Sequence, residues 1–240
     1  MKLSVLLASY NGERFIAKQI SSILDQLLSG DELIISDDGS TDRTREIVSS
    51  FNDARMTILE GPREGINANF INAYEHASGD AVLFSDQDDI WLPGRAQLYR
   101  DRLVLHDFVI CDAEIIDEQG RVLTRSYFQK NRTPKTFFGN LLRCRTLGCC
   151  IGFRRAVIGE KLNIFRDYHT LPFDYSLTLL SLFYFKVYFS KKPYHQYRRH
   201  NNNNSLGGEK SKSTFWRMAT FRIRVFIYVL GAKRWLPPHS

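Results

Sequence analysis

The chain has 240 residues, of which 43% are hydrophobic and 25% are charged, and its formal net charge is +7. These values are ordinary for a globular protein with a full hydrophobic core, and the length predicts one domain or one domain with an appendage. No stretch of about 20 apolar residues is free of charge, so the sequence predicts no transmembrane helix.

The cysteines and the first residues indicate the compartment. Cys111, Cys144, Cys149 and Cys150 form no CxxC pair, and the adjacent pair has poor geometry for sharing a zinc ion or an ordinary disulfide. No signal peptide precedes Leu3. We therefore expect free thiols and a reducing, cytoplasmic location.

The first half alternates short apolar runs with segments of helical periodicity. Strands are predicted over 2–8, 32–36, 56–59 and 81–85, and helices over 13–28, from a cap at Ser40 or Thr41 to about 51, and over 67–77. This alternation is typical of an α/β fold with a mostly parallel central sheet and helices on both faces.

The second half is less regular. Helices are predicted over 95–105, 133–143 and 176–185, and strands over 108–111, 121–124, 148–153 and 186–189. Residues 201–208 read as a polar loop. Residues 214–230 place arginines among apolar residues at helical spacing, which indicates a basic amphipathic helix.

Three polar clusters follow predicted strands: SYNG, DDGS and SDQDD. In parallel sheets, ligands bind at the carboxyl ends of the strands. We therefore expect these clusters to meet in one site.

The third cluster holds Asp86, Asp88 and Asp89 directly after an apolar run. Such acids repel one another, and each is costly to bury unpaired. A divalent cation removes both problems, and hard oxygen ligands suit Mg²⁺ or Mn²⁺. The alternative is an acidic surface turn with Trp91 and Pro93 packed beneath it.

The second cluster offers a carboxylate beside the first strand's loop, which can accept from a nucleotide base or from ribose hydroxyls. The alternative is a capped turn at a helix start. The sequence has no GxGxxG after the first strand and no GxxxxGK[ST]. A diphosphate bound here needs another source of positive charge, which a metal on Asp86 and Asp88 would supply.

The segments SVLLASYNGERFIAKQISSIL, IISDDGSTDRT, EGINANF and FSDQDDIWLP resemble successive motifs of the family 2 inverting glycosyltransferases with the GT-A fold. The DQDDIW form is similar to the bacterial rhamnosyltransferase-like branch. The resemblance is strong over 2–95 and continues weakly to 205. It implies a GT-A domain over 1–205, with a nucleotide-sugar half (1–95) and an acceptor half (96–205), followed by a basic segment over 206–240.

The resemblance implies roles for the residues of the nucleotide pocket. Ser9, Tyr10 and Asn11 would line the pocket for base and ribose. Asp38 would contact the base, and Asn69 would support the pocket.

The resemblance also implies a metal site. Asp86 would touch the ribose or the metal, and Asp88 would be the main protein ligand of Mn²⁺ or Mg²⁺. Asp89 would either bind the metal or stabilise the turn. Downstream, YRRHNN resembles the family's YRxHxxN ending, so His200 would complete the metal shell or, with Arg198, hold the departing diphosphate.

Inversion at the anomeric carbon requires a general base for the acceptor hydroxyl. The family places an acid at a helix start, often in an HDWW pattern, and Asp174 in LPFDYS matches it without the His and the aromatic pair. The alternatives are that Asp174 is a plain N-cap, or that Asp167 is the base. The strand GCCIGF would line the acceptor side.

The favoured hypothesis is a metal-dependent inverting glycosyltransferase that uses dTDP-rhamnose or a UDP-hexose. The implied acceptor is a saccharide or a polyprenyl-diphosphate-linked glycan in the synthesis of cell-surface polysaccharide. The alternatives are a nucleotidyltransferase that makes nucleotide sugars and a non-catalytic basic module. The basic segment would be a core helix, a helix on the cytoplasmic membrane surface, or a nucleic-acid contact. The resemblance favours the membrane surface and no nucleic acid.

Overall fold

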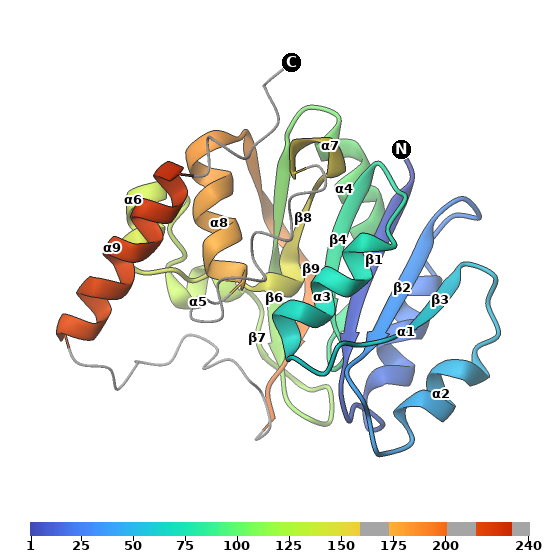
Figure 1. The fold of residues 1–240 in the computed structure, drawn as a ribbon. Coiled ribbons are helices and arrows are strands. Elements are labelled where there is room, and N and C mark those ends of the chain that lie inside the picture. The colour runs from blue at the N-terminus through green and yellow to red at the C-terminus, as the bar shows by residue number, and fades with distance from the viewer. Residues whose placement is uncertain (159–172, 201–214, 232–240) are drawn as a thin grey trace.

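The computed structural model describes residues 1–158, 173–200 and 215–231, as drawn in Figure 1. The predicted loop over 201–208 lies outside these residues. The strands are β1 (Leu3–Ser9), β2 (Glu32–Asp37), β3 (Met56–Glu60), β4 (Ala81–Asp86), β5 (Ile90–Trp91), β6 (Phe108–Ile116), β7 (Val122–Thr124), β8 (Ile151–Arg154) and β9 (Val187–Arg198).

The helices alternate with these strands in the first half and cluster in the second. They are α1 (Ile16–Leu24), α2 (Thr44–Ser50), α3 (Ile66–Glu75), α4 (Arg95–Leu103), α5 (Tyr127–Asn131), α6 (Phe137–Leu142), α7 (Arg155–Ile158), α8 (Phe173–Tyr184) and α9 (Phe215–Gly231), with a 3-10 turn, η1 (Gly148–Cys150). Among the described residues, no helix combines the length and the apolar character needed to cross a bilayer.

One sheet runs through the whole molecule, in the order β3-β2-β1-β4-β8-β6-β9-β5, with β7 paired to β6. The strands β3, β2, β1 and β4 are parallel, whereas β8 is antiparallel to both β4 and β6. The chain adds strands on one side of β1 and then returns to add β4 on the other. Because such crossovers are right-handed, α1 and α2 lie on one face of the sheet and α3 on the other (Figure 1).

The parallel strands form the core. Every residue of β1 is buried, and so are five of the six residues of β2 and of β4. Strands covered on both faces need apolar residues on both, which explains runs such as Ala81–Phe84. The predicted α/β sheet of the first half is confirmed.

Several predicted boundaries were wrong. The helix expected over 13–28 spans only Ile16–Leu24. The helix expected to start at Ser40 or Thr41 begins at Thr44 after Arg43. The cause is Asp37, whose carboxylate accepts from both the amide and the hydroxyl of Ser40.

In the second half, two strands are longer than predicted, because polar residues interrupt their apolar pattern. The strand expected over 108–111 continues through Asp112 to Ile116, and that carboxylate accepts from the Ser126 hydroxyl and the Phe128 amide. The strand expected over 186–189 is only the start of β9, which pairs with β6 as far as Arg198. The first three residues of the strand expected over 148–153 form η1 instead.

Glu32, at the start of β2, provides a test of how the sheet is held at its amino end. Burial alone would raise the pKa of Glu32, but hydrogen bonds from Ser4, Ser78 and Lys2 lower it to about 2. Because this pKa lies below that of the unfolded chain, the stabilisation is complete above about pH 4.5 and is lost as the pH falls towards 2. Glu32→Gln should lower the free energy of unfolding by about 1–2 kcal/mol at pH 7, allowing for partial exposure.

The measurement is urea unfolding of both proteins at pH 7 and at pH 3. The difference between them should shrink at pH 3, and the exposed-site control Glu64→Gln should stay within about 0.5 kcal/mol of the wild type. An equal difference at both pH values would contradict the account.

Candidate active site

The three polar clusters predicted from the sequence meet at one edge of the sheet. β1 lies between β2 and β4, and the register pairs Ser9 with Asp37 and Ala8 with Asp86. The strand ends are therefore level with one another. The expectation that SYNG, DDGS and SDQDD adjoin is confirmed.

The ends of β1 and β2 are fixed by Asp37, which we had not assigned to the site. Its buried carboxylate accepts from the Ser9 hydroxyl (3.1 Å), the Ser40 amide (2.9 Å) and the Arg45 Nε (3.0 Å). Ser9 is buried and engaged in this network. Asp37 thus sets the shape of the loop that follows β2.

Asp38 and Asn69 hold neighbouring parts of the predicted nucleotide pocket. The Asp38 carboxylate accepts from the backbone amides of Arg63 (2.7 Å) and Gly65 (3.0 Å). The buried Asn69 Nδ2 donates to the carbonyl oxygens of Ser36 (2.8 Å) and Ser9 (3.3 Å). Both residues hold backbone segments at this edge of the sheet, and their contact with a nucleotide stays a prediction.

The loop after β1 is clamped to the acidic turn by Gln87, which sequence reasoning missed. Its side-chain amide accepts from the Tyr10 amide and donates to the Tyr10 carbonyl, both at 2.8 Å. Asn11 has a left-handed backbone (φ 49°), and its Oδ1 accepts from the Thr41 amide. The ring of Tyr10 is exposed beside this loop, where it is available to a ligand.

Asp88 meets His200, as the hypothesis of a shared metal site requires. Asp88 Oδ2 and His200 Nε2 are 2.6 Å apart, although 112 positions separate them. The imidazole lies over Phe15, with ring centroids 5.2 Å apart. Residues after β4 and after β9 thus come together beside Phe15, at the start of α1.

Asp89 belongs to the framework of the turn. Its buried carboxylate accepts from the Arg198 amide (2.8 Å) and bonds His195 Nε2 (2.7 Å). Arg95 donates to the other ring nitrogen, Nδ1, so the proton of the imidazole lies on Nε2 and points at Asp89. Burial and the Arg95 charge hold the pKa of His195 well below its usual range, so the link to Asp89 is a hydrogen bond of the neutral ring.

Arg198 is buried and holds backbone carbonyls around the acidic turn. Its Nε donates to the Asp88 carbonyl (2.7 Å), and its Nη1 donates to those of Asp117 and Glu118 (3.0 Å each). The guanidinium lies 4.9 Å from the centre of the Phe15 ring. Contact of Arg198 with a diphosphate stays a prediction.

Asp174 lies in the first turn of α8 and faces the same edge. Its Oδ1 accepts from the Tyr175 amide (2.8 Å), and burial raises the pKa of its carboxyl. Repulsion from Asp174 also helps to raise the pKa of Asp86, which places the two carboxylates in electrostatic reach. η1 leaves room for Asp174, because a Cβ on Gly148 would approach its Cβ to 3.0 Å. Asp167, the rival base, lies outside the described residues.

The carboxyl groups of the acidic turn lie close enough to repel one another. Burial and repulsion among the carboxylates raise the pKa of Asp86 and of Asp89 well above the usual range. Ligand atoms of Asp86, Asp89 and Cys149 lie within 4.8 Å of one another. The two carboxylates of this cluster are hard oxygen donors whose mutual repulsion a divalent cation would relieve, whereas the Cys149 thiol is a soft donor.

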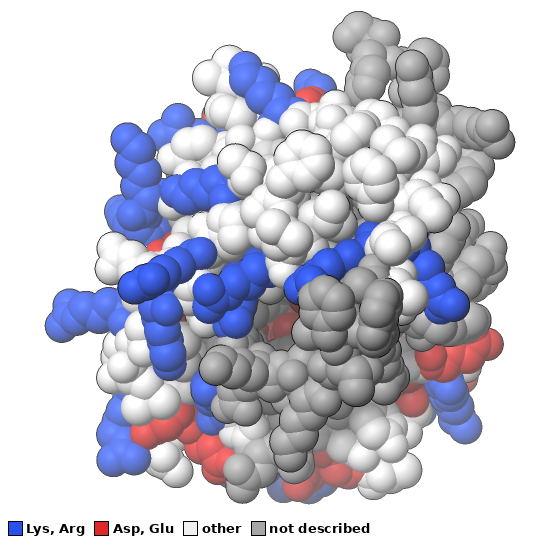
Figure 2. Space-filling view, turned by 90° about the vertical axis from the view of Figure 1, so that its left-hand side faces the viewer, with Lys and Arg blue, Asp and Glu red and all other residues white. Residues whose placement is uncertain are grey.

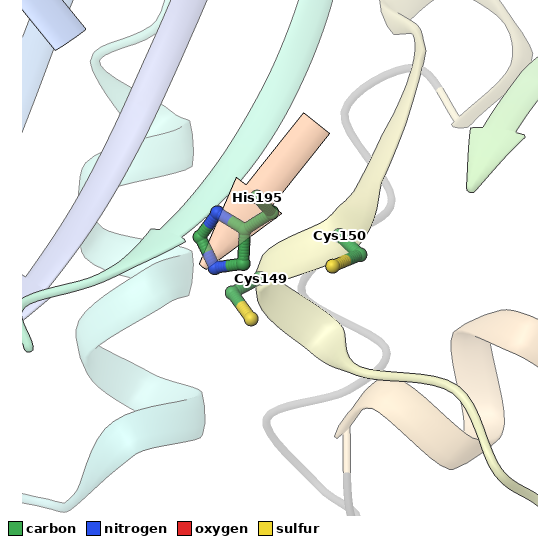
Figure 3. Close-up of side chains that lie close together, drawn as sticks. All are labelled: Cys149, Cys150 and His195. Carbon is green, nitrogen blue, oxygen red and sulfur yellow. The ribbon is translucent and has the colours of Figure 1, made fainter. Parts of the chain in front are cut away.

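A second cluster, Cys149, Cys150 and His195, also has ligand atoms within 4.8 Å, and Figure 3 shows the imidazole beside Cys149. Both nitrogens of His195 already bond protein groups, and the buried guanidinium of Arg95 adjoins them. Burial also raises the pKa of both thiols well above the usual range, which disfavours thiolates. All four cysteines are free, as predicted, and we assign no metal to this cluster.

Comparison with known proteins gives consistent matches. A model described as Glycosyl transferase family 2 matches residues 4–162. The dTDP-rhamnosyl transferase RfbG of Shigella flexneri is 26% identical over 237 residues, which cover 90% of this chain and 79% of that protein. The UDP-Glc:alpha-D-GlcNAc-diphosphoundecaprenol beta-1,3-glucosyltransferase WfgD of Escherichia coli is 32% identical over 151 residues, which cover 61% of this chain and 57% of that enzyme.

Solved structures agree on the fold. S. aureus TarS, residues 1–349 with UDP-GlcNAc, matches with a TM-score of 0.66 at 20% identity, covering 95% of this chain and 67% of that one. The chain therefore spans little more than half of the E. coli enzyme and about two thirds of the TarS structure.

The assignment of Asp89 to the framework predicts a loss of stability. An Asn side chain has one acceptor oxygen, so in Asp89→Asn either His195 or the Arg198 amide would face an NH₂ group. We expect the free energy of unfolding to fall by about 3 kcal/mol, measured by urea titration. Asp101→Asn, at an exposed site on α4, should change it by less than about 0.5 kcal/mol. Equal stability of the Asp89 variant and the wild type would refute the assignment.

Proposed function

The chain belongs to glycosyl transferase family 2, and on this premise we propose that it is a metal-dependent inverting glycosyltransferase. The single observation that carries the proposal is the convergence of Asp88, His200 and Asp174 at one edge of the sheet. This edge is also where the predicted nucleotide pocket lies. A site with a cation-binding side and a partly buried acid suits transfer from a diphosphate donor.

The donor is a nucleotide-diphosphate sugar. The two curated relatives carry UDP-Glc and dTDP-rhamnosyl in their names, and the TarS structure contains UDP-GlcNAc. We propose dTDP-rhamnose or a UDP-hexose for this chain. Tyr10, Asn11 and Asp38 would contact the nucleoside, supported from beneath by Ser9 and Asn69.

Asp88 and His200 would hold Mn²⁺ or Mg²⁺, with Asp86 either joining them or binding the ribose. When bound, the cation would offset the negative charge of the diphosphate and help it to leave. Asp89 would act indirectly, because its bonds to β9 keep Asp88 and His200 close together. Arg198 would reinforce that position through the Asp88 carbonyl.

Asp174 would act as the general base. Its carboxylate would accept the proton of the acceptor hydroxyl while that oxygen attacks the anomeric carbon from the side opposite the nucleotide. The new glycosidic bond forms as the bond to the diphosphate breaks, so the anomeric configuration inverts. A pKa raised by burial makes this carboxylate a stronger base than an exposed aspartate.

The acceptor is a saccharide or a glycan linked to a polyprenyl diphosphate, in the assembly of cell-surface polysaccharide such as O-antigen, capsule or lipopolysaccharide. The E. coli relative and a Campylobacter jejuni relative have diphosphoundecaprenol or PP-undecaprenol in their names. A cytoplasmic enzyme working at the inner face of the cell membrane would meet such acceptors.

The metal assignment predicts the effect of removing one ligand. Asp88→Asn should lower the rate of sugar transfer by about 100-fold or more, because the diphosphate loses its counter-charge. The measurement is release of nucleoside diphosphate from dTDP-rhamnose and UDP-hexoses with Mn²⁺. Excess chelator should abolish wild-type activity, and added Mn²⁺ should restore it.

Asp101→Asn serves as the control and should keep the wild-type rate. A melting temperature close to that of the wild type would show that Asp88→Asn is folded. Full activity of the variant, or of wild-type protein in excess chelator, would contradict metal dependence.

The base assignment predicts a separate kinetic effect. Asp174→Asn removes the proton acceptor but keeps the size of the side chain, so kcat should fall by about 10²–10⁴-fold. The KM for the donor should stay within about threefold, because the nucleotide pocket lies on other strand ends. An unchanged kcat would show that Asp174 is not the general base. Asp167→Asn would then be the next variant to measure.

A further inference from the structure

Helix α9 is apolar on two opposite sides. Val225, Tyr228 and Val229 are buried towards the rest of the protein. Ile223 and Ile227 are 58% and 62% exposed, and with Leu230 they form an outward stripe at helical spacing. Packing inside the protein explains the buried side. It does not explain the outward stripe, because exposing large aliphatic side chains to water does not stabilise the fold.

Helix α6 presents a matching stripe next to it. Phe138 and Leu142, one helical turn apart, are 68% and 64% exposed. Arg222 on α9 donates to the Leu142 carbonyl (2.6 Å), so the two helices are neighbours. We call the exposed residues of both helices the α6–α9 face, which consists of Phe138, Leu142, Ile223, Ile227 and Leu230.

The charged residues of α9, and those of α6 and its flanks, are all basic. Residues 215–231 contain three arginines and residues 135–145 contain one lysine and two arginines, and neither stretch contains an aspartate or a glutamate. Arg143 and Arg224 are exposed. Figure 2 looks at this side of the molecule and shows Lys and Arg flanking an uncharged surface, with Asp and Glu gathered mainly towards the lower edge.

We propose that the α6–α9 face binds the surface of an anionic lipid bilayer, with its apolar residues among the acyl chains and its arginines at the phosphates. Apolar residues and cations on one face match the two layers that a bilayer surface offers. A second copy of the chain would bring arginines against arginines. Nucleic acid would pair with the arginines but leave Ile223, Ile227 and Phe138 in water.

This placement puts the candidate active site across α9 from the lipid surface. Phe221 on α9 contacts Tyr175, with ring centroids 5.2 Å apart, and Tyr175 follows Asp174 in the first turn of α8. A glycan anchored in the bilayer would therefore meet the base close to the membrane. This last step rests on the proposed function, whereas lipid binding itself does not.

The test is flotation of the full chain with vesicles, without donor or metal. Wild-type protein should float with vesicles of phosphatidylcholine and phosphatidylglycerol, and float less with phosphatidylcholine alone or at high salt. Ile223→Ser/Ile227→Ser should lower the partition coefficient by about tenfold or more. Arg224→Glu should weaken binding to the anionic vesicles only.

Matched controls use exposed residues elsewhere. Ile58→Ser/Ile66→Ser makes the same chemical change near β3 and α3, and Lys18→Glu makes a charge reversal on α1; both should bind vesicles as the wild type does. Thermal melting checks that all variants fold. Wild-type protein that stays unbound, or a double variant on α9 that floats like the wild type, would overturn the proposal.

Two other outcomes would also overturn it. One is that the wild-type protein forms a dimer, the double variant on α9 is a monomer, and neither protein binds vesicles. The other is tight binding to duplex DNA that depends on Arg224, with no flotation. Because release of nucleoside diphosphate from the donor is measured without vesicles, failure of lipid binding is distinguishable from failure of the proposed function.

Discussion

The arrangement of the site depends on one buried carboxylate. Asp89 links the turn after β4 to β9 through His195 and the Arg198 amide, and Arg95 completes the chain of bonds from the far side of the imidazole. A buried carboxyl group is tolerated only when its oxygens are hydrogen-bonded, so this contact specifies one position of the turn. Asp88 and His200 approach each other as a consequence.

That constraint lets one short turn serve two purposes. Asp89 points into the protein and is hydrogen-bonded there, whereas Asp86 and Asp88 remain partly exposed at the edge of the sheet. Gln87, between them, turns to the loop after β1 and fixes Tyr10. Framework residues thus alternate with the residues proposed to contact the ligand, and the repulsion among the acids is what a bound cation would relieve.

Much of the first half could be predicted from the sequence, because its apolar runs end sharply in Asn, Asp and Gly. These residues mark where each strand ends, and the strand ends define the edge of the sheet where the candidate site lies. The second half was harder to predict. In β9, the apolar pattern is interrupted by Lys191, Lys192 and Pro193, so the sequence predicts a shorter strand than the structure has. Within the site, the sequence offered no signal for the partner of Asp89, since His195 is 106 positions away, or for the bidentate contact of Gln87. Such pairings arise from tertiary structure and have no local pattern.

The central claim is that the turn after β4 and the end of β9 form one cation site for a nucleoside diphosphate. It is tested most directly by anomalous diffraction at the manganese edge from crystals grown with Mn²⁺ and UDP or dTDP. The account predicts one strong peak at about 2.2 Å from a carboxylate oxygen of Asp88 and from His200 Nε2, next to the diphosphate. A nucleotide bound at this edge without a manganese peak, or a peak among Cys149, Cys150 and His195 instead, would contradict it.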